Sequence, residues 1–187
     1  MKVYEPFRYT FYHTILKEDV SDLRASNEFV FNAGQNHRRT SEDNLYILNK
    51  FPDIKSLIEK YFNDCISETY GYKDKFTITR SWINRWLSGD MIYSHNHKEC
   101  YYSGLLYYGD YSEDTVPLIF ENPIYHASNY TFWNSKPNPM QDPIRIKPKK
   151  NLLIFFPSCI NHNCTTINDE RVSLAFNFQP IIKNVCN

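Results

Sequence analysis

The sequence predicts a mostly β protein, an antiparallel sandwich or barrel, with helices confined to its N-terminal half. From about residue 76 onward, several short β-branched or aromatic runs follow one another without a helical pattern between them. Aromatic residues make up 17% of the chain, with fifteen Tyr against only five Gly. That composition is typical of a sheet-rich protein.

The helical signals lie before residue 76. Asp53 follows Pro52 and is expected to cap a helix that Gly71 ends. Ser41 is expected to cap a shorter turn. Within the longer helix, apolar residues recur at helical spacing: Ile54, Leu57, Ile58, Tyr61, Phe62, Cys65 and Ile66.

Five strands are expected in the remainder of the chain. They cover residues 77–87, 103–108, 116–120, 152–156 and 171–178. The last alternates most cleanly, so its two faces should differ. Val172, Leu174, Phe176 and Phe178 form one face, and Arg171, Ser173, Ala175 and Asn177 form the other. The long segment 121–143 is expected to be a loop, and a loop of that length is usually functional or disordered.

Length and composition predict one domain. The 187 residues are 42% hydrophobic, enough for a substantial core. Residues 1–75 should form a largely helical part and residues 76–180 the β core. The formal net charge is zero, so the sequence shows no excess of positive charge that would attract nucleic acid or a membrane surface. Five Cys without a regular framework, no apolar leader and no membrane-spanning run predict a cytoplasmic protein with free thiols.

Three histidines could form a metal site. His95 and His97 are two residues apart, so at the end of a strand they would point to one face with Cα atoms roughly 6.5–7 Å apart. His162 follows the apolar run 152–156 and could close the site. Three imidazoles suit Fe, Zn, Cu or Ni. The alternatives are solvated surface histidines, or a structural zinc site that also uses Cys100, Cys159 or Cys164.

Arg171 and Ser173 share the polar face of the last strand. A guanidinium grips a carboxylate with two hydrogen bonds, and a neighbouring hydroxyl adds another. The alternative is a polar face turned to solvent. Because that face carries a single charge and the small Ala175, a ligand cavity fits it about as well as open water does.

Taken in order, these pieces resemble the 2-oxoglutarate/Fe(II) oxygenases of phages and bacteria and, more distantly, the prolyl hydroxylases. The resemblance covers about residues 78–178, and the step from His162 to Arg171 is especially similar. It is carried by Trp82-Ile83-Asn84, His95-x-His97, residues 103–108, residues 152–158, His162 and Glu170-Arg171-Val172-Ser173.

The resemblance implies a double-stranded β-helix, a jelly-roll or cupin-like fold, with the N-terminal helices packed outside. It implies a dioxygenase, an oxidoreductase that uses Fe(II), 2-oxoglutarate as co-substrate and O2 to hydroxylate a small molecule or a protein side chain. If a phage encodes the chain, the compartment would be the host cytoplasm. No catalytic residue beyond the metal ligands is implied.

In the metal site, His95 matches the first His of the family's H-x-D/E pair and His162 matches the distal His. The chain departs from the family at His97, where most members have a carboxylate. The close phage-like group also tends to show H-x-H, so His97 is expected to complete a three-His site, as in some cupin-type dioxygenases. Alternatively it points away, and water, Glu99 or Glu121 takes the third position, although neither glutamate has the right spacing.

In the co-substrate site, Arg171 matches the basic residue that holds the far carboxylate of 2-oxoglutarate, with Ser173 beside it. Tyr108, the second residue of the Tyr-Tyr pair, matches a tyrosine that hydrogen-bonds the same carboxylate, and Tyr107 is the less favoured choice.

Two rival hypotheses remain at this stage. One is a cupin-like metalloenzyme without 2-oxoglutarate, because Gly89, five residues and then His-x-His resemble the first cupin motif. The other is a zinc-stapled β-sandwich binding protein. Turnover of 2-oxoglutarate to succinate would separate the oxygenase from both.

Overall fold

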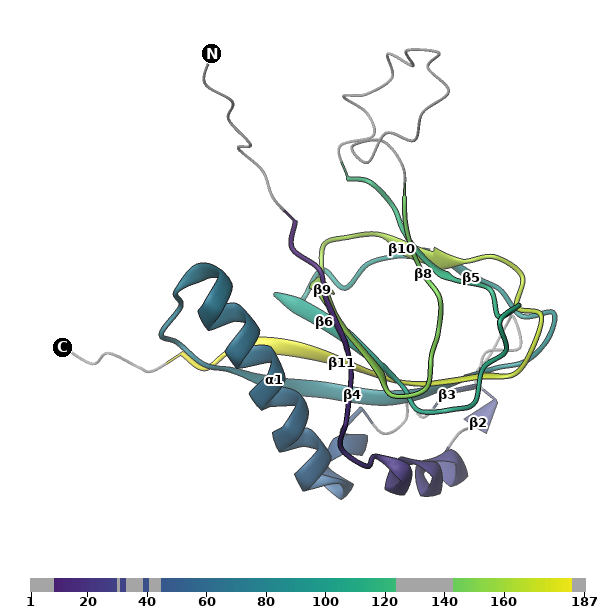
Figure 1. The fold of residues 1–187 in the computed structure, drawn as a ribbon, viewed down its shortest axis with the longest axis horizontal. Coiled ribbons are helices and arrows are strands. Elements are labelled where there is room, and N and C mark those ends of the chain that lie inside the picture. The colour runs from purple at the N-terminus through teal and green to yellow at the C-terminus, as the bar shows by residue number, and fades with distance from the viewer. Residues whose placement is uncertain (1–8, 30, 33–38, 41–44, 124–142, 183–187) are drawn as a thin grey trace, which may run out of the picture.

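A computed structural model describes residues 9–29, 31–32, 39–40, 45–123 and 143–182. Two sheets face each other, and one long helix lies on the outer side of the larger sheet (Figure 1). The elements are β1 (Tyr12–Ile15), η1 (Ser21–Phe29), β2 (Phe31–Asn32), β3 (Arg39–Thr40), η2 (Ile47–Lys50), α1 (Pro52–Tyr70), β4 (Phe76–Trp86), β5 (Ile92–His95), β6 (Tyr102–Tyr107), β7 (Leu118–Phe120), β8 (Ile144–Ile146), β9 (Leu152–Pro157), β10 (His162–Cys164) and β11 (Arg171–Pro180).

The larger sheet has the strand order β1-β9-β6-β11-β4-β3-β2, and the smaller has the order β5-β10-β7-β8. Every pairing between these strands is antiparallel. The predicted antiparallel sandwich is therefore confirmed. The five predicted strands correspond to β4, β6, β7, β9 and β11, each with both ends within two residues of the prediction.

Helix α1 begins two residues earlier than predicted, with its cap at position 51 and not at position 53. Pro52 occupies the first helical position, where its missing N–H is no loss. The capping position belongs to Phe51, which makes no side-chain cap, so Asp53 lies in the first turn and not at the cap. There its negative charge still complements the helix dipole. Gly71 ends the helix as predicted, in a left-handed conformation with φ 67°.

The main core lies between α1 and the outer face of the larger sheet. The α1 residues buried there are Ile54, Ile58, Phe62 and Ile66. Phe62 stacks on Phe178 with ring centroids 4.0 Å apart. The apolar face of β11 packs into this cluster, as its alternation predicts. The same cluster contains Leu16, Val20 and Leu23 from the N-terminal part, so the two predicted parts of the chain share one core.

A second apolar cluster lies between the two sheets, and Tyr107, Leu118 and Phe156 of this cluster line the cavity described below. Its buried members are Tyr107, Leu118, Phe120, Leu152, Ile154, Phe156 and Ile160. The predicted loop 121–143 and the predicted cap Ser41 lie largely or wholly outside the described residues. Among the described helices, none has the length and apolar character needed to cross a membrane.

Candidate metal centre and co-substrate cavity

A cavity of about 740 Å³ opens between the two sheets. The inward faces of β4, β6 and β11 line one side of it, and residues from the β5 and β10 ends line the other. The polar face predicted for β11 lies on this cavity: Arg171, Ser173, Ala175 and Asn177. From the sequence, this polar face of β11 could have been turned either to solvent or to a ligand cavity. In the structure it is turned to a cavity.

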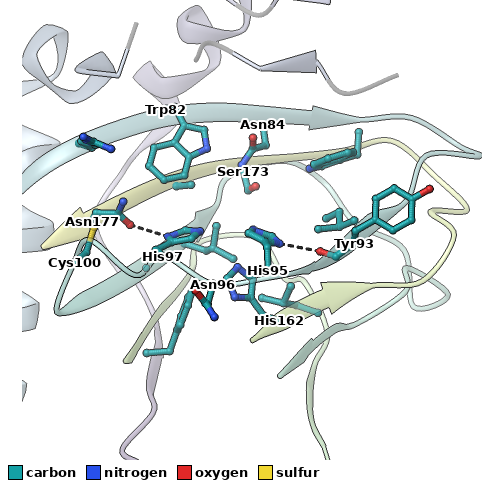
Figure 2. Close-up of a pocket in the computed structure, with 18 of the residues that line it drawn as sticks. Trp82, Asn84, Tyr93, His95, Asn96, His97, Cys100, His162, Ser173 and Asn177 are labelled. Carbon is teal, nitrogen blue, oxygen red and sulfur yellow. Dashed lines mark hydrogen bonds between the residues drawn. The ribbon is translucent and has the colours of Figure 1, made fainter. Parts of the chain in front are cut away.

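The three predicted metal ligands meet at the cavity wall. His95 ends β5, His162 begins β10, and the two residues are direct partners in the antiparallel pairing of these strands. His97 follows two residues after β5. The nearest ring nitrogens of the three residues all lie within 4.8 Å of one another. Figure 2 shows the three rings converging in the cavity.

Each of the three rings is held through its Nδ1 atom. Nδ1 of His95 lies 2.8 Å from the carbonyl oxygen of Tyr93, and Nδ1 of His162 lies 3.2 Å from that of Ile160. Nδ1 of His97 lies 2.9 Å from Asn177 Oδ1. An imidazole that donates Nδ1–H to an oxygen presents Nε2 as its ligand atom, the arrangement common to histidines that bind metals.

Burial keeps His162 neutral. Its side chain is 4% exposed, while His95 is exposed and His97 is half-buried. Burial first, and then the neighbouring His95 and His97, lower the pKa of His162 to about 3, while the hydrogen bond with the Ile160 carbonyl acts in the opposite direction. A histidine must be neutral to bind a metal, so the site holds His162 in the required state at neutral pH. Three neutral imidazoles are a donor set that suits Fe(II).

The other candidate ligands make other contacts. Within the described part of the chain, His95, His97 and His162 are the group that could hold a metal ion. Glu99 forms an ion pair with Arg80 at 3.2 Å, and the carboxylate of Glu121 accepts a hydrogen bond from Asn163.

The cysteines do not join the histidines either. Cys164 is buried and its Sγ donates to the carbonyl oxygen of Pro117 over 3.3 Å. Cys159 is exposed, and Cys100 lines the cavity as a free thiol. The predicted alternative of a zinc staple that combines cysteine and histidine therefore has no support in the described residues.

At the other end of the cavity, Arg171 is a buried cation. It is 2% exposed, and its Nη2 donates to the hydroxyl of Tyr107. Its Nη1 donates to Cys164 Sγ at 3.1 Å and to the Val116 carbonyl oxygen at 3.4 Å. Among the described residues no carboxylate forms an ion pair with it. A buried charge is costly unless an opposite charge meets it, so this site is suited to an anion from outside the chain.

The tyrosine that contacts Arg171 is Tyr107, whereas the sequence favoured Tyr108 for the carboxylate site. Neighbouring residues of a strand point to opposite faces. Tyr107 pairs with Ser173 across β6 and β11 and lines the cavity, whereas Tyr108 follows the strand and packs in the main core on the other side of the sheet. The pairing of position 107 with the polar face of β11 is the signal that could have identified it. Burial raises the pKa of Tyr107, against the effect of the Arg171 charge, and so keeps the phenol protonated.

Two further residues of the cavity have polar atoms that lack a partner among the described residues. These are Nε1 of Trp82 and Oδ1 of Asn84, both buried and both from the Trp-x-Asn motif on β4. Ser173 lies opposite Asn84 in the pairing of β4 and β11, and its side chain is 4% exposed. Buried polar groups are normally hydrogen-bonded, so these atoms indicate a cavity built for a polar ligand.

Comparison with known proteins identifies the family. Residues 80–177, more than half of the chain, match the family described as "Putative 2OG-Fe(II) oxygenase". A search of curated proteins found no match.

Several solved structures have a similar fold. One is an oxidoreductase of the 2OG-Fe(II) oxygenase family from Burkholderia pseudomallei, with 17% identity and a TM-score of 0.57 over 89% of this chain and 85% of that one. A prolyl-4-hydroxylase from Pseudomonas putida has 12% identity and a TM-score of 0.62 over 91% and 92%. HygX from Streptomyces hygroscopicus, solved with nickel and 2-oxoglutarate, has 9% identity and a TM-score of 0.62 over 92% and 83%.

At these identities the structural likeness shows the fold, and the predicted double-stranded β-helix is confirmed. The match to the family over residues 80–177 covers β4 to β11 almost completely, and with it the three histidines and Arg171. The chain therefore belongs to the 2-oxoglutarate- and Fe(II)-dependent oxygenase family, whose members are oxidoreductases that use O2.

Proposed function

We propose that His95, His97 and His162 hold the Fe(II) of this oxygenase, and that Arg171, Tyr107 and Ser173 hold the far carboxylate of 2-oxoglutarate. One observation carries this proposal. A three-histidine cluster and a buried arginine without a carboxylate partner among the described residues line the same cavity. A dianionic co-substrate that binds a metal at one end and a guanidinium at the other matches that arrangement.

The chain's own residues would bind and orient the reactants. The guanidinium of Arg171 offers its fork to a carboxylate, and the Tyr107 hydroxyl, which accepts a hydrogen bond from Arg171, keeps its own proton to donate. Leu105, Leu118 and Phe156 line the cavity with apolar surface that keeps water away. When bound, Fe(II) with 2-oxoglutarate and O2 supplies the oxidation of the substrate, with succinate and CO2 as co-products.

The substrate class we propose is a small molecule or a protein side chain that is hydroxylated. The cavity supports this, because at about 740 Å³ it has room for a ligand of moderate size beside the co-substrate. Among the described residues, two buried polar atoms of the cavity have no partner, and they would serve such a ligand: Nε1–H of Trp82 as a donor and Oδ1 of Asn84 as an acceptor. We also propose a reducing compartment such as the cytoplasm, supported by the four described cysteines, all of which are free thiols.

The function is tested by titrating the chain anaerobically with Fe(II) and 2-oxoglutarate. A visible charge-transfer band of the chelated complex is expected, and so is formation of succinate after O2 is admitted. His162→Ala should remove iron binding and leave the fold largely intact. Iron retained at the stoichiometry of the unmodified protein in that variant would count against the ligand assignment.

The co-substrate assignment is tested at Arg171. Removing one partner of a desolvated charged pair costs about 2–5 kcal/mol. Since 1.4 kcal/mol is tenfold in affinity, Arg171→Ala should weaken 2-oxoglutarate binding by on the order of thirtyfold or more. Arg171→Lys keeps the positive charge but loses the paired N–H donors of the guanidinium, and it should weaken 2-oxoglutarate binding less than Arg171→Ala does. Iron affinity should change little in both variants.

Arg85→Ala is the matched control for this test. Arg85 lies on the same pair of strands, but its half-buried side chain is not among the residues that line the cavity and forms an ion pair with Glu170 at 2.8 Å. The control should bind 2-oxoglutarate like the unmodified protein. Unaltered binding of 2-oxoglutarate in Arg171→Ala would overturn the co-substrate assignment.

A further inference from the structure

Position 97 holds a histidine, where most members of the wider oxygenase family have a carboxylate ligand. A carboxylate at this position would be an anion at neutral pH, and either of its oxygens could bind a metal. A histidine binds a metal only through an unprotonated nitrogen, so the proton of the neutral ring must lie on the other nitrogen. The surroundings of His97 Nδ1 therefore decide whether its Nε2 can act as a ligand.

Nδ1 of His97 belongs to a small buried network of side chains. It lies 2.9 Å from Asn177 Oδ1, the contact dashed in Figure 2, and 2.9 Å from Ser103 Oγ. Ser103 Oγ donates to Asn177 Oδ1 over 2.8 Å and lies 2.7 Å from Ser158 Oγ. Both serines are fully buried, and Asn177 is 5% exposed. The backbone N–H of His97 also donates to the Ser158 carbonyl oxygen over 2.9 Å.

The number of protons in this network fixes the tautomer of His97. The Ser103 hydroxyl has one proton and donates it to Asn177 Oδ1, and an amide oxygen has no proton to give. The contacts of Nδ1 with these two oxygens are therefore hydrogen bonds only if Nδ1 itself carries a proton. A neutral ring protonated at Nδ1 has its lone pair on Nε2.

We propose that Asn177 is a positioning residue, which with Ser103 fixes His97 in the Nδ1–H tautomer and so allows a neutral histidine to bind the metal where most of the family has a carboxylate. This inference rests on the proposed function, because it requires His97 to be a ligand. Nδ1 of His95 and Nδ1 of His162 each contact a backbone carbonyl oxygen. A backbone carbonyl oxygen accepts a hydrogen bond whichever side chain its residue carries. Nδ1 of His97, by contrast, contacts side-chain oxygens, so its protonation depends on Asn177 and Ser103.

The opposite orientation of the Asn177 amide gives the opposite tautomer. With the amide turned over, Nδ2 would donate to His97 Nδ1, and the ring proton would move to Nε2, where it blocks metal binding. The tautomer of His97 therefore distinguishes the two arrangements, and it can be measured without metal and without turnover.

The first experiment is NMR of the full-length, metal-free chain labelled with ¹⁵N in its histidines. Two-bond ¹H–¹⁵N correlations separate protonated from unprotonated ring nitrogens, and the His97 signals are assigned by their loss in His97→Gln. The unmodified protein should show His97 protonated at Nδ1. Asn177→Asp keeps an acceptor oxygen and should retain that tautomer.

Asn177→Leu should allow the Nε2–H form to appear. Leu has a similar size but no acceptor, and Ser103, released from Asn177, can turn its own proton toward Nδ1. A His97 protonated at Nε2 in the unmodified protein would overturn the proposal. So would an Nδ1–H tautomer that is unchanged in Asn177→Leu.

The second experiment measures the affinity for Fe(II) alone under anaerobic conditions. Losing the partner of a metal-binding histidine typically weakens metal binding 10–100-fold, so the dissociation constant in Asn177→Leu should rise by about that factor. Asn177→Asp should restore the affinity or exceed it. Ser81→Ala is the matched control, since Ser81 is a buried serine that accepts a hydrogen bond from the Leu48 backbone instead. The control should bind Fe(II) normally.

The two proposals fail in different ways. If the unmodified chain binds no Fe(II), or if His97→Gln binds it as tightly as the unmodified chain, the assignment of the ligands fails. If the unmodified chain binds Fe(II), His97→Gln loses it, and Asn177→Leu binds it with unchanged affinity, the ligands stand and the positioning role of Asn177 is overturned.

Discussion

The guanidinium of Arg171 is the most buried basic group among the described residues, and its immediate neighbours are a phenol, a thiol and a backbone carbonyl. None of these carries a negative charge at neutral pH, because burial raises the pKa of both Tyr107 and Cys164. The ring of Tyr107 lies beneath the guanidinium, with 5.0 Å from Cζ to the ring centroid. These contacts orient the cation without neutralising it, which leaves an anionic ligand as its missing partner.

The two adjacent tyrosines give a matched pair of variants at this scale. Tyr107→Phe removes a hydroxyl that touches Arg171, and a hydrogen bond to a charged group is worth about 1.5–3 kcal/mol. The affinity for 2-oxoglutarate should therefore fall about tenfold or more, measured anaerobically by the charge-transfer band. Tyr108→Phe changes the core on the other face and should leave that affinity within about twofold. Equal effects in the two variants would contradict the assignment of Tyr107.

Strands β6 and β11 carry both the main core and the cavity on opposite faces. Their pairing requires a close approach at Gly104, which lies directly opposite Phe176. A Cβ added to Gly104 would lie 2.2 Å from Phe176 Cε2 and 2.7 Å from the Ile154 carbonyl oxygen on β9. The glycine therefore makes room for the Phe176 ring between three neighbouring strands.

Gly104→Ala should destabilise the protein by about 1–3 kcal/mol, the usual cost of overpacking a core. Urea unfolding would measure this as a lower midpoint with an unchanged slope. Because the added methyl meets the Phe176 ring, Gly104→Ala combined with Phe176→Leu should be less destabilised than the sum of the two single changes. Additive losses would indicate that the Ile154 backbone contact, not the Phe176 ring, is responsible.

At the scale of the whole molecule, the site joins the two sheets. The histidines stand at the ends of β5 and β10 in the smaller sheet, whereas Arg171 belongs to β11 in the larger sheet. Leu16 and Leu23 from the N-terminal part share the main core with residues of the β strands. This shared core supports the prediction that residues 1–187 form one domain, which stays a prediction.

Ligands that join the sheets should stabilise the fold in two separable steps. A ligand at about 100 times its dissociation constant adds about 2.7 kcal/mol to the free energy of unfolding. Fe(II) should therefore raise the anaerobic unfolding midpoint, and 2-oxoglutarate added with Fe(II) should raise it again. His162→Ala should lose both increments, whereas Arg171→Ala should lose mainly the second. A second increment that survives in Arg171→Ala would place the far carboxylate elsewhere.

The sequence by itself determined the antiparallel class, the five main strands, α1 and its end at Gly71, and the faces of β11, because periodicity and turn residues are local. It also singled out the three histidines and Arg171 by their order and spacing. The tertiary structure alone decided how they meet. His95 and His162 are 67 positions apart and become partners only through the β5–β10 pairing.

The choice of Tyr107 over Tyr108 likewise depended on the register of β6 against β11, because a shift of one residue exchanges the two faces of a strand. The network of Ser103, Ser158 and Asn177 around His97 had no signal in the sequence. Its members come from three segments, and buried hydrogen bonds between such segments depend on side-chain distances and directions, which only the packed sheets establish.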